Sequence, residues 1–169
     1  LEELRSRLSK FGLEVAEDKT RILEFGRNAY NRSKRSGNKV ASFNFLGFCH
    51  YCRDSRNGKF IMGHKTGKDN LRRKLSDMKS YIKSVMNQLP LGIWIETIKR
   101  KLSGHYNYFG ISGNYHCLQQ YYYRTVSMLF KQVNRRSQRR SFNFVDFMEY
   151  LGRSSIPQPM IKVNLYKFS

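Results

Sequence analysis

The sequence predicts an α+β fold, in which a small antiparallel β lobe with a hairpin precedes a predominantly helical bundle of three to four helices. Aromatic and apolar residues cluster in short segments of the first part, and Asn57-Gly58 separates two of them. Asn-Gly between two strands is the strongest short-range hairpin signal. The apolar spacing then changes to three and four, the period of an amphipathic helix. We therefore expect two domains, residues 1–66 and 67–169.

The first 40 residues predict a helix, two strands and a loop. Apolar residues recur at helical spacing up to Phe11, and Gly12 follows as a helix end. Alternation predicts a strand at residues 13–15, and the apolar content of residues 21–25 predicts a second one. The segment 26–40 is rich in Gly, Asn, Ser and basic residues. It is therefore expected to be a loop.

The rest of the β lobe is expected to be one hairpin. The aromatic segment 43–51 predicts a strong strand, and residues 59–62 predict the strand that returns after Asn57-Gly58. This segment leads into a Cys-x-x-Cys pair, Cys49 and Cys52, which could indicate zinc or redox chemistry. In a strand, however, these two side chains point to opposite faces, and there is no second Cys pair. Zinc or redox chemistry is therefore only a third interpretation of this chain, which metal analysis would decide.

Four helices are expected in the second domain. Pro90 ends the first, and Gly110 closes the second. Ser141 can cap the fourth, and Pro157 and Pro159 lead into an extended tail. The residues predicted to mark the apolar faces are Leu71, Leu75, Met78, Ile82, Val85 and Leu89 in the first helix, Trp94, Ile98, Leu102, His105, Tyr106 and Phe109 in the second, Leu118, Tyr121, Tyr122, Thr125 and Leu129 in the third, and Phe144, Phe147, Met148 and Leu151 in the fourth.

The charge balance points to a polyanionic partner. The chain has 32 Lys and Arg against 12 Asp and Glu, a net charge of +20 in 169 residues. Self-repulsion at this charge opposes compaction, and phosphate is the usual counter-charge. A disordered basic tail is excluded, because 40% of the residues are hydrophobic and 14% are aromatic. Nucleic acid is therefore the expected partner.

A membrane is not an expected partner, and the cytoplasm is the expected location. The basic residues are spread over several elements instead of one amphipathic helix, and no apolar run is long enough to cross a bilayer. We therefore expect no signal peptide. Three cysteines do not suggest a disulfide framework, which favours a reducing compartment.

The first helix of the bundle carries the clearest candidate binding surface. Lys68, Arg72, Lys79 and Lys83 fall within about 60° of one another on a helical wheel, beside the apolar stripe. Such a basic row can follow a phosphate backbone. A plain solvated face is the alternative interpretation, although few acidic residues balance this row.

Two further segments are candidates for binding. Residues 131–140 hold five basic residues and no acidic one, which suits phosphate and sugar contacts, with a disordered basic linker as the alternative. Asn107 and Tyr108 point away from the apolar face and could meet a base or ribose, with packing as the alternative. The residues predicted to bind nucleic acid are Lys65, Lys68, Arg72, Arg73, Lys79, Lys83, Lys101, His105, Asn107, Tyr108, Lys131, Arg135, Arg136, Arg139 and Arg140.

No catalytic arrangement is evident in the sequence. Two-metal phosphoryl transfer needs clustered carboxylates, and the five Asp residues include no adjacent pair. There is no P-loop and no recognisable Ser-His-Asp arrangement. We expect this chain, on its own, to catalyse nothing.

The order of motifs in the first domain resembles one protein family. Gly-Leu-Glu-Val at 12–15, Lys-Thr-Arg-Ile-Leu-Glu-Phe-Gly at 19–26 and Phe-x-Phe-Leu-Gly-Phe at 43–48 resemble the end of the palm in bacterial group II intron reverse transcriptases. The second domain resembles the maturase region of the same family, also called domain X or thumb. The matching segments are 102–114, 118–121, 134–142 and 156–159.

The resemblance implies a role in gripping nucleic acid. Phe45, Leu46, Gly47 and Phe48 would lie at the primer grip and shape the path of the primer. The helical thumb would hold the RNA–DNA template–primer duplex and grip group II intron RNA during splicing. This implies a bacterial, cytoplasmic protein of a mobile element.

The Tyr-x-Asp-Asp motif that holds the catalytic metals in the family is absent from this sequence. We therefore expect no cofactor in this chain, with Mg²⁺ needed only by the missing catalytic part. The chain is expected to be the C-terminal portion of a longer reverse transcriptase/maturase, with the N-terminal half as a candidate partner. Such a portion should expose an apolar patch where the palm would pack. The alternative is a stand-alone RNA-binding splicing factor derived from the maturase domain.

Overall fold

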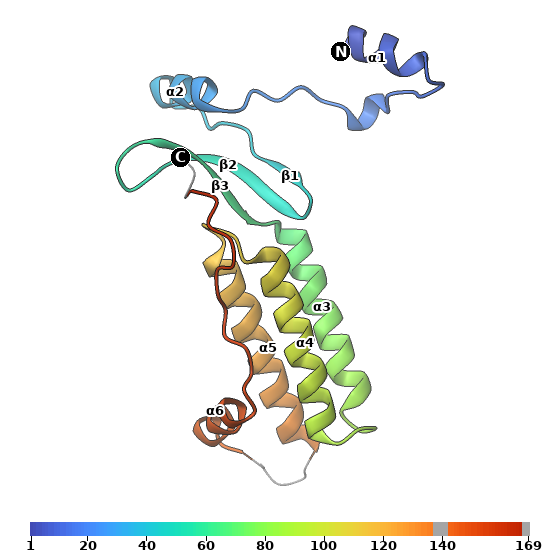
Figure 1. Ribbon diagram of the computed structural model, residues 1–169, viewed down its shortest axis with the longest axis vertical. Coiled ribbons are helices and arrows are strands. Elements are labelled where there is room, and N and C mark those ends of the chain that lie inside the picture. Colours follow the sequence, from blue (N-terminus) through green and yellow to red (C-terminus); the bar gives the residue numbers. More distant parts are fainter. Residues whose placement is uncertain (137–141, 167–169) are drawn as a thin grey trace.

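The predicted α+β fold is confirmed by a computed structural model, which describes residues 1–136 and 142–166. A three-stranded antiparallel sheet lies between the N-terminal segment and the bundle of long helices (Figure 1). The long helices of the bundle run side by side away from the sheet, so that one end of the bundle contacts the sheet.

The sheet has the strand order β1-β2-β3, with β1 at Phe43–Phe45, β2 at Phe48–Asp54 and β3 at Phe60–Thr66. The predicted hairpin between β2 and β3 is confirmed. The single strand predicted at 43–51 is wrong, because Leu46 and Gly47 form a tight turn that divides it. Both turn residues have positive φ, 48° and 81°, as in the two-residue hairpins that match the twist of a sheet.

The N-terminal segment differs most from the expectation. It contains α1 (Glu2–Ser9), the short 3-10 helix η1 (Glu17–Lys19) and α2 (Arg27–Ser36). The strands predicted at 13–15 and 21–25 are wrong, because no neighbouring strand pairs with these residues in the described part of the chain. The loop predicted at 26–40 is also wrong, since most of it is α2.

The bundle consists of α3 (Lys68–Val85), α4 (Leu91–Phe109), α5 (Tyr115–Arg136) and α6 (Phe144–Arg153). The residues predicted for the apolar faces of α3, α4 and α5 are buried, except Leu89, which lies beyond the end of α3 and is half-buried. In the fourth helix Phe147 and Leu151 are buried, but Phe144 is exposed, contrary to expectation. Asn143 caps α6 by accepting a hydrogen bond from the Asp146 amide, whereas the predicted cap, Ser141, lies outside the described residues.

The sheet and the bundle are joined by a buried asparagine. The Asn114 Oδ1 accepts a hydrogen bond from the Thr66 amide at 2.7 Å, and its Nδ2 donates to the Phe109 carbonyl at 2.8 Å. The Asn114 Nδ2 also donates to the Thr66 hydroxyl at 2.9 Å. Thr66 ends β3, Phe109 ends α4 and Asn114 precedes α5, so one side chain fixes three elements.

The C-terminal tail returns along the bundle to the sheet. Val163 forms a parallel bridge with Ile111, and the Val163 carbonyl accepts a hydrogen bond from the Ser112 amide at 3.0 Å. The Tyr166 hydroxyl donates to the Met62 carbonyl at 3.2 Å. The tail thus connects the loop before α5 to strand β3.

Candidate nucleic-acid interface

The Leu46–Gly47 turn is held by hydrogen bonds from the bundle. The Gly47 carbonyl accepts from the Gly67 amide at 2.9 Å and from the Asn70 Nδ2 at 3.3 Å. The Leu46 carbonyl accepts from the Tyr108 hydroxyl at 2.9 Å. The turn is therefore anchored to the start of α3 and to the end of α4.

Gly47 cannot be replaced without displacing this arrangement. A Cβ at this position would lie 2.4 Å from the Asn70 Nδ2, and its φ of 81° disfavours residues with side chains. The side chains beside it point outward: Phe45 is 59% exposed and Leu46 is 66% exposed. The turn is thus a fixed backbone feature with an apolar tip.

A groove of about 870 Å³ opens beside this turn. The groove is lined by residues of the β1–β2 turn, of the N-terminal part of α3 and of the C-terminal part of α4. Three cations face it, Arg73, Lys74 and Lys101, together with the two carboxylates Asp69 and Asp77. The lining residues are Asn44, Leu46, Gly47, Gly67, Asp69, Asn70, Arg73, Lys74, Asp77, Met78, Lys101, Gly104, His105, Tyr108, Phe109 and Tyr121.

The groove brings together part of the predicted set and adds residues that the sequence did not single out. Leu46, Gly47, Arg73, Lys101, His105 and Tyr108 meet there as predicted members. Asn44, Asn70 and Lys74 were missed. The sequence does contain a pattern that indicates Asn70 and Lys74. Together with Asp77 they recur at spacings of four and three, which marks a polar face of α3.

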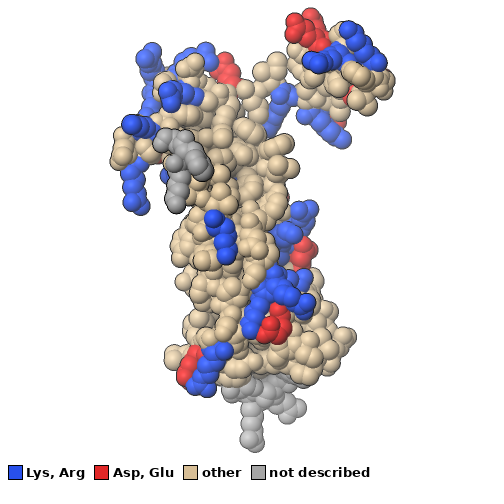
Figure 2. All heavy atoms as spheres, viewed as in Figure 1, with Lys and Arg blue, Asp and Glu red and all other residues tan. Residues whose placement is uncertain are grey.

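The basic row of α3 lies on a different flank. Lys68, Arg72, Lys79 and Lys83 are all exposed, as a binding row requires. Helix geometry places this row about 160° around α3 from the face that carries Asn70 and Lys74. Basic side chains, with some acidic ones among them, line this part of the bundle in Figure 2. The predicted row and the groove therefore lie on different flanks of α3, which meet where Arg72 pairs with Asp69 at 3.4 Å.

His105 is a buried, neutral ring at the floor of the groove. It is 6% exposed and stacks on Tyr121 with ring centroids 3.9 Å apart. Burial, with a smaller contribution from Lys74, lowers the pKa of His105 to about 4. Burial and the nearby Asp77 raise the pKa of Tyr121 to about 12. At neutral pH His105 thus offers a neutral ring to the groove and no positive charge.

The other predicted residues are dispersed. Asn107 is exposed but points about 100° around α4 from Tyr108, away from the groove. Lys65 is exposed on β3, with its amine 5.0 Å from the Tyr51 ring centroid. Lys131 and Arg135 are exposed on α5, so the linker alternative is wrong for residues 131–136. The Arg136 side chain, Arg139 and Arg140 lie outside what the structure describes.

The primer-grip-like residues divide between surface and core. Phe48 packs against the bundle, with its ring centroid 5.1 Å from that of Phe109 and 5.9 Å from that of Tyr108. Phe45, Leu46 and Gly47 form the turn itself. Phe48 therefore supports the turn from beneath.

Among the described residues, no three metal-ligating side chains lie close enough together to hold an ion. Cys49 and Cys52 both lie on β2, where their separation of three places them on opposite faces of the sheet. None of the described helices has the length and apolarity that a bilayer crossing requires.

We expect Tyr108→Phe to loosen the Leu46–Gly47 turn while leaving the fold intact. The variant keeps the ring beside Phe48 and removes only the hydroxyl that donates to the Leu46 carbonyl. Unfolding should become easier by no more than about 1 kcal/mol, because Tyr108 is half exposed. Hydrogen exchange should accelerate at the amides of residues 46–48. Tyr123→Phe, at an exposed tyrosine of α5, is the matched control. Unchanged exchange in Tyr108→Phe would show that the hydroxyl does not hold the turn.

No family model, curated protein or solved structure matches this chain.

Proposed function

We propose that this chain binds an RNA–DNA template–primer duplex and group II intron RNA, as the C-terminal portion of a group II intron reverse transcriptase/maturase. One observation carries the proposal. The Leu46–Gly47 turn, which by resemblance belongs to a primer grip, is anchored beside a groove lined by Arg73, Lys74 and Lys101.

The chemistry of the groove suits an A-like duplex. Such a duplex is recognised mainly through its backbone and the shape of its grooves, with contacts to phosphates and to 2′-hydroxyls. The three cations can neutralise phosphates, and the amide of Asn44 can hydrogen-bond to sugars. The Asn70 amide is already engaged by the Gly47 carbonyl and by Arg73. Two carboxylates leave a local charge of only about +1, so affinity has to draw on the field of the whole chain, whose net charge is +20.

The exposed apolar residues of the N-terminal segment favour a portion of a larger protein over a stand-alone splicing factor. Phe11 is 74% exposed and Ile22 is 76% exposed. Helix α1 contributes no buried residue. A palm domain packed against this segment would cover these side chains. In this proposal the chain grips nucleic acid, and the polymerase chemistry with its Mg²⁺ belongs to the catalytic part.

The groove can be tested with the triple variant Arg73→Gln, Lys74→Gln, Lys101→Gln. We expect its affinity for an RNA–DNA hybrid to fall about tenfold or more at physiological salt. The slope of log K against log salt should become shallower by about 2, because each lost phosphate contact removes about 0.7 to 0.9. Fluorescence anisotropy over a series of KCl concentrations measures both quantities.

The matched control is Arg100→Gln, Arg124→Gln, Arg153→Gln, which removes the same charge from three exposed arginines scattered over α4, α5 and α6. Equal affinities for the groove variant and this control would contradict the proposal. The α3 row is tested by Arg72→Gln, Lys79→Gln, Lys83→Gln. This variant should bind all RNAs with similarly reduced affinity, because phosphate contacts carry little sequence information.

A further inference from the structure

Helix α2 carries a basic row that is separate from both surfaces described above. Four of its ten residues are basic and none is acidic. Arg27, Asn31 and Arg35 are spaced by four and therefore lie in one row along the helix. All three are exposed, whereas Ala29 on the inner face is buried.

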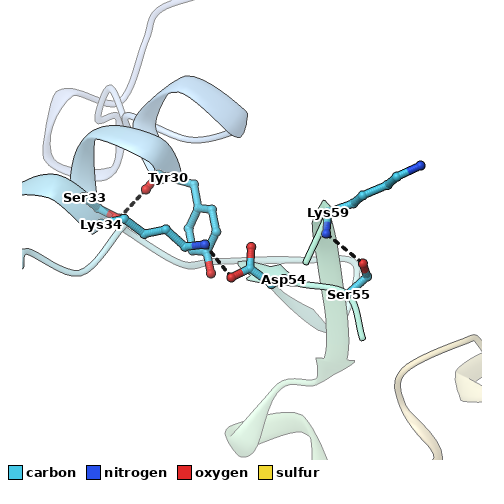
Figure 3. Close-up of polar contacts among 6 residues, drawn as sticks. All are labelled: Tyr30, Ser33, Lys34, Asp54, Ser55 and Lys59. Carbon is cyan, nitrogen blue, oxygen red and sulfur yellow. Dashed lines mark hydrogen bonds and ion pairs between the residues drawn. The ribbon is translucent and has the colours of Figure 1, made fainter. Parts of the chain in front are cut away.

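The helix is fixed to the hairpin, so this row has a defined position. The Lys34 amine donates to the Asp54 carboxylate at 2.5 Å and lies 4.9 Å from the Tyr30 ring centroid. Figure 3 shows the Lys34 and Tyr30 side chains extending from α2 toward Asp54. The Tyr30 and Phe60 rings are 5.6 Å apart. The hydrogen bond from Lys34 holds the pKa of Asp54 below its ordinary value.

The tip of the hairpin extends the same surface. Arg56 and Lys59 are exposed there, next to the strand ends that hold Tyr30 and Lys34. The neighbouring carboxylates are already engaged: Asp54 by Lys34, and Glu24 by Arg32 at 3.3 Å. In the part of the chain that the structure describes, no carboxylate pairs with Arg27, Arg35, Arg56 or Lys59. Figure 2 shows the resulting gathering of Lys and Arg over α2 and the adjoining end of the sheet.

We propose that α2 and the β2–β3 tip form a second binding surface, which takes the phosphate backbone of an RNA strand. Four cations that no described carboxylate pairs supply the charge, and one of them, Arg27, lies 6.0 Å from the Phe60 ring centroid. The exposed amides of Asn28 and Asn31 suit sugar and phosphate oxygens. An acidic membrane is a poorer fit, because a membrane-binding helix buries an apolar face and α2 exposes none.

This surface is distinct from the groove. The groove lies at the Phe48 end of β2 and the new surface at the Asp54 end, about 20 Å along the strand. One long RNA could contact both, and linked contacts of this kind raise affinity beyond that of either alone. The inference goes beyond the proposed function, since it needs neither the groove nor the primer grip.

The test is the triple variant Arg27→Gln, Arg35→Gln, Arg56→Gln, compared with the scattered control Arg100→Gln, Arg124→Gln, Arg153→Gln. Binding of a long structured RNA is measured by anisotropy at several salt concentrations, and folding is checked by thermal unfolding. We expect an affinity about tenfold lower than that of the control at physiological salt. The salt slope should be shallower by about 2. If this triple variant unfolds, Arg56→Gln, Lys59→Gln replaces it, because these side chains take no part in the Lys34–Asp54 contact, and a slope shallower by about 1 to 2 is then expected.

An affinity equal to that of the control would overturn the inference. A second outcome would also overturn it: the triple variant binds RNA as before but no longer binds vesicles of phosphatidylserine and phosphatidylcholine. That result would assign the surface to acidic lipid. The groove variant, measured in parallel, separates the two proposals. If only the groove variant loses RNA affinity, the proposed function stands and this second surface does not. If only the α2 variant loses RNA affinity, the second surface stands and the groove proposal does not.

Discussion

Asn114→Ala should lower the free energy of unfolding by about 3 kcal/mol or more. The Asn114 side chain is fully buried and satisfies the Thr66 amide and the Phe109 carbonyl. Alanine would leave the Thr66 amide buried without this partner, at a cost of about 1–3 kcal/mol. It would also remove the hydrogen bonds to the Thr66 hydroxyl and to the Phe109 carbonyl, which keeps the Ile111 amide as a donor, at about 1 kcal/mol each. Urea unfolding followed by circular dichroism measures the change as a shift of the midpoint.

The control for this prediction is Asn107→Ala, which alters an exposed asparagine of the preceding helix and should change stability by less than about 0.5 kcal/mol. Asn114→Asp tests the mechanism. It keeps an oxygen for the Thr66 amide but loses the donor to the Phe109 carbonyl, and it places a carboxyl group in the core. A stability of Asn114→Ala within 1 kcal/mol of the unaltered protein would mean that other contacts hold the sheet to the bundle.

Acidification should destabilise the protein through His105. Its pKa is about 4 in the folded state against an ordinary value of 6.5, so the unfolded state binds the proton more readily. The stabilisation is therefore complete above pH 6.5 and is lost as the pH falls through about 4. The full loss is about 3 kcal/mol, of which about 2 kcal/mol is lost by pH 5. Burial also lowers the pKa of His64, which acts in the same direction.

The measurement is urea unfolding of the protein and of His105→Phe at pH 7 and pH 5. Phenylalanine can keep the stacking on Tyr121 and cannot take up a proton. The difference in stability between the two pH values should shrink by about 2 kcal/mol in this variant. His116→Gln, at an exposed histidine, is the matched control. An undiminished pH dependence in His105→Phe would assign the acid sensitivity to other groups.

The helices of the bundle could be predicted from sequence because their apolar stripes are long and regular. Eighteen residues of α3 repeat one spacing, and the core follows from it. Helix α2 could not be predicted in this way. Its ten residues bury only Ala29, and its position depends on Tyr30, Lys34 and their partners on the hairpin, which are distant in sequence. A helix held by such contacts has no periodic apolar signal of its own.

The candidate groove was only partly predictable for a related reason. Charge and spacing identified Arg73 and Lys101 one by one, but the wheel of a single helix favoured the exposed row at Lys68 and Lys79. The groove lies on the flank of α3 where the Leu46–Gly47 turn contacts α3 and α4, and the sequence of one helix does not contain this information. The division of 43–51 into two strands, which creates this turn, required two residues at positive φ, one of them a leucine.

The tail that returns to the sheet has a consequence for the order of events during synthesis. The Met62 carbonyl meets the Tyr166 hydroxyl across 104 residues of chain. A ribosome adds about 5–20 residues each second, so the finished hairpin has to wait on the order of 5–20 seconds for this contact. Until then, β3 lacks the tail as a neighbour. A chaperone could therefore meet the nascent sheet before the tail closes on it.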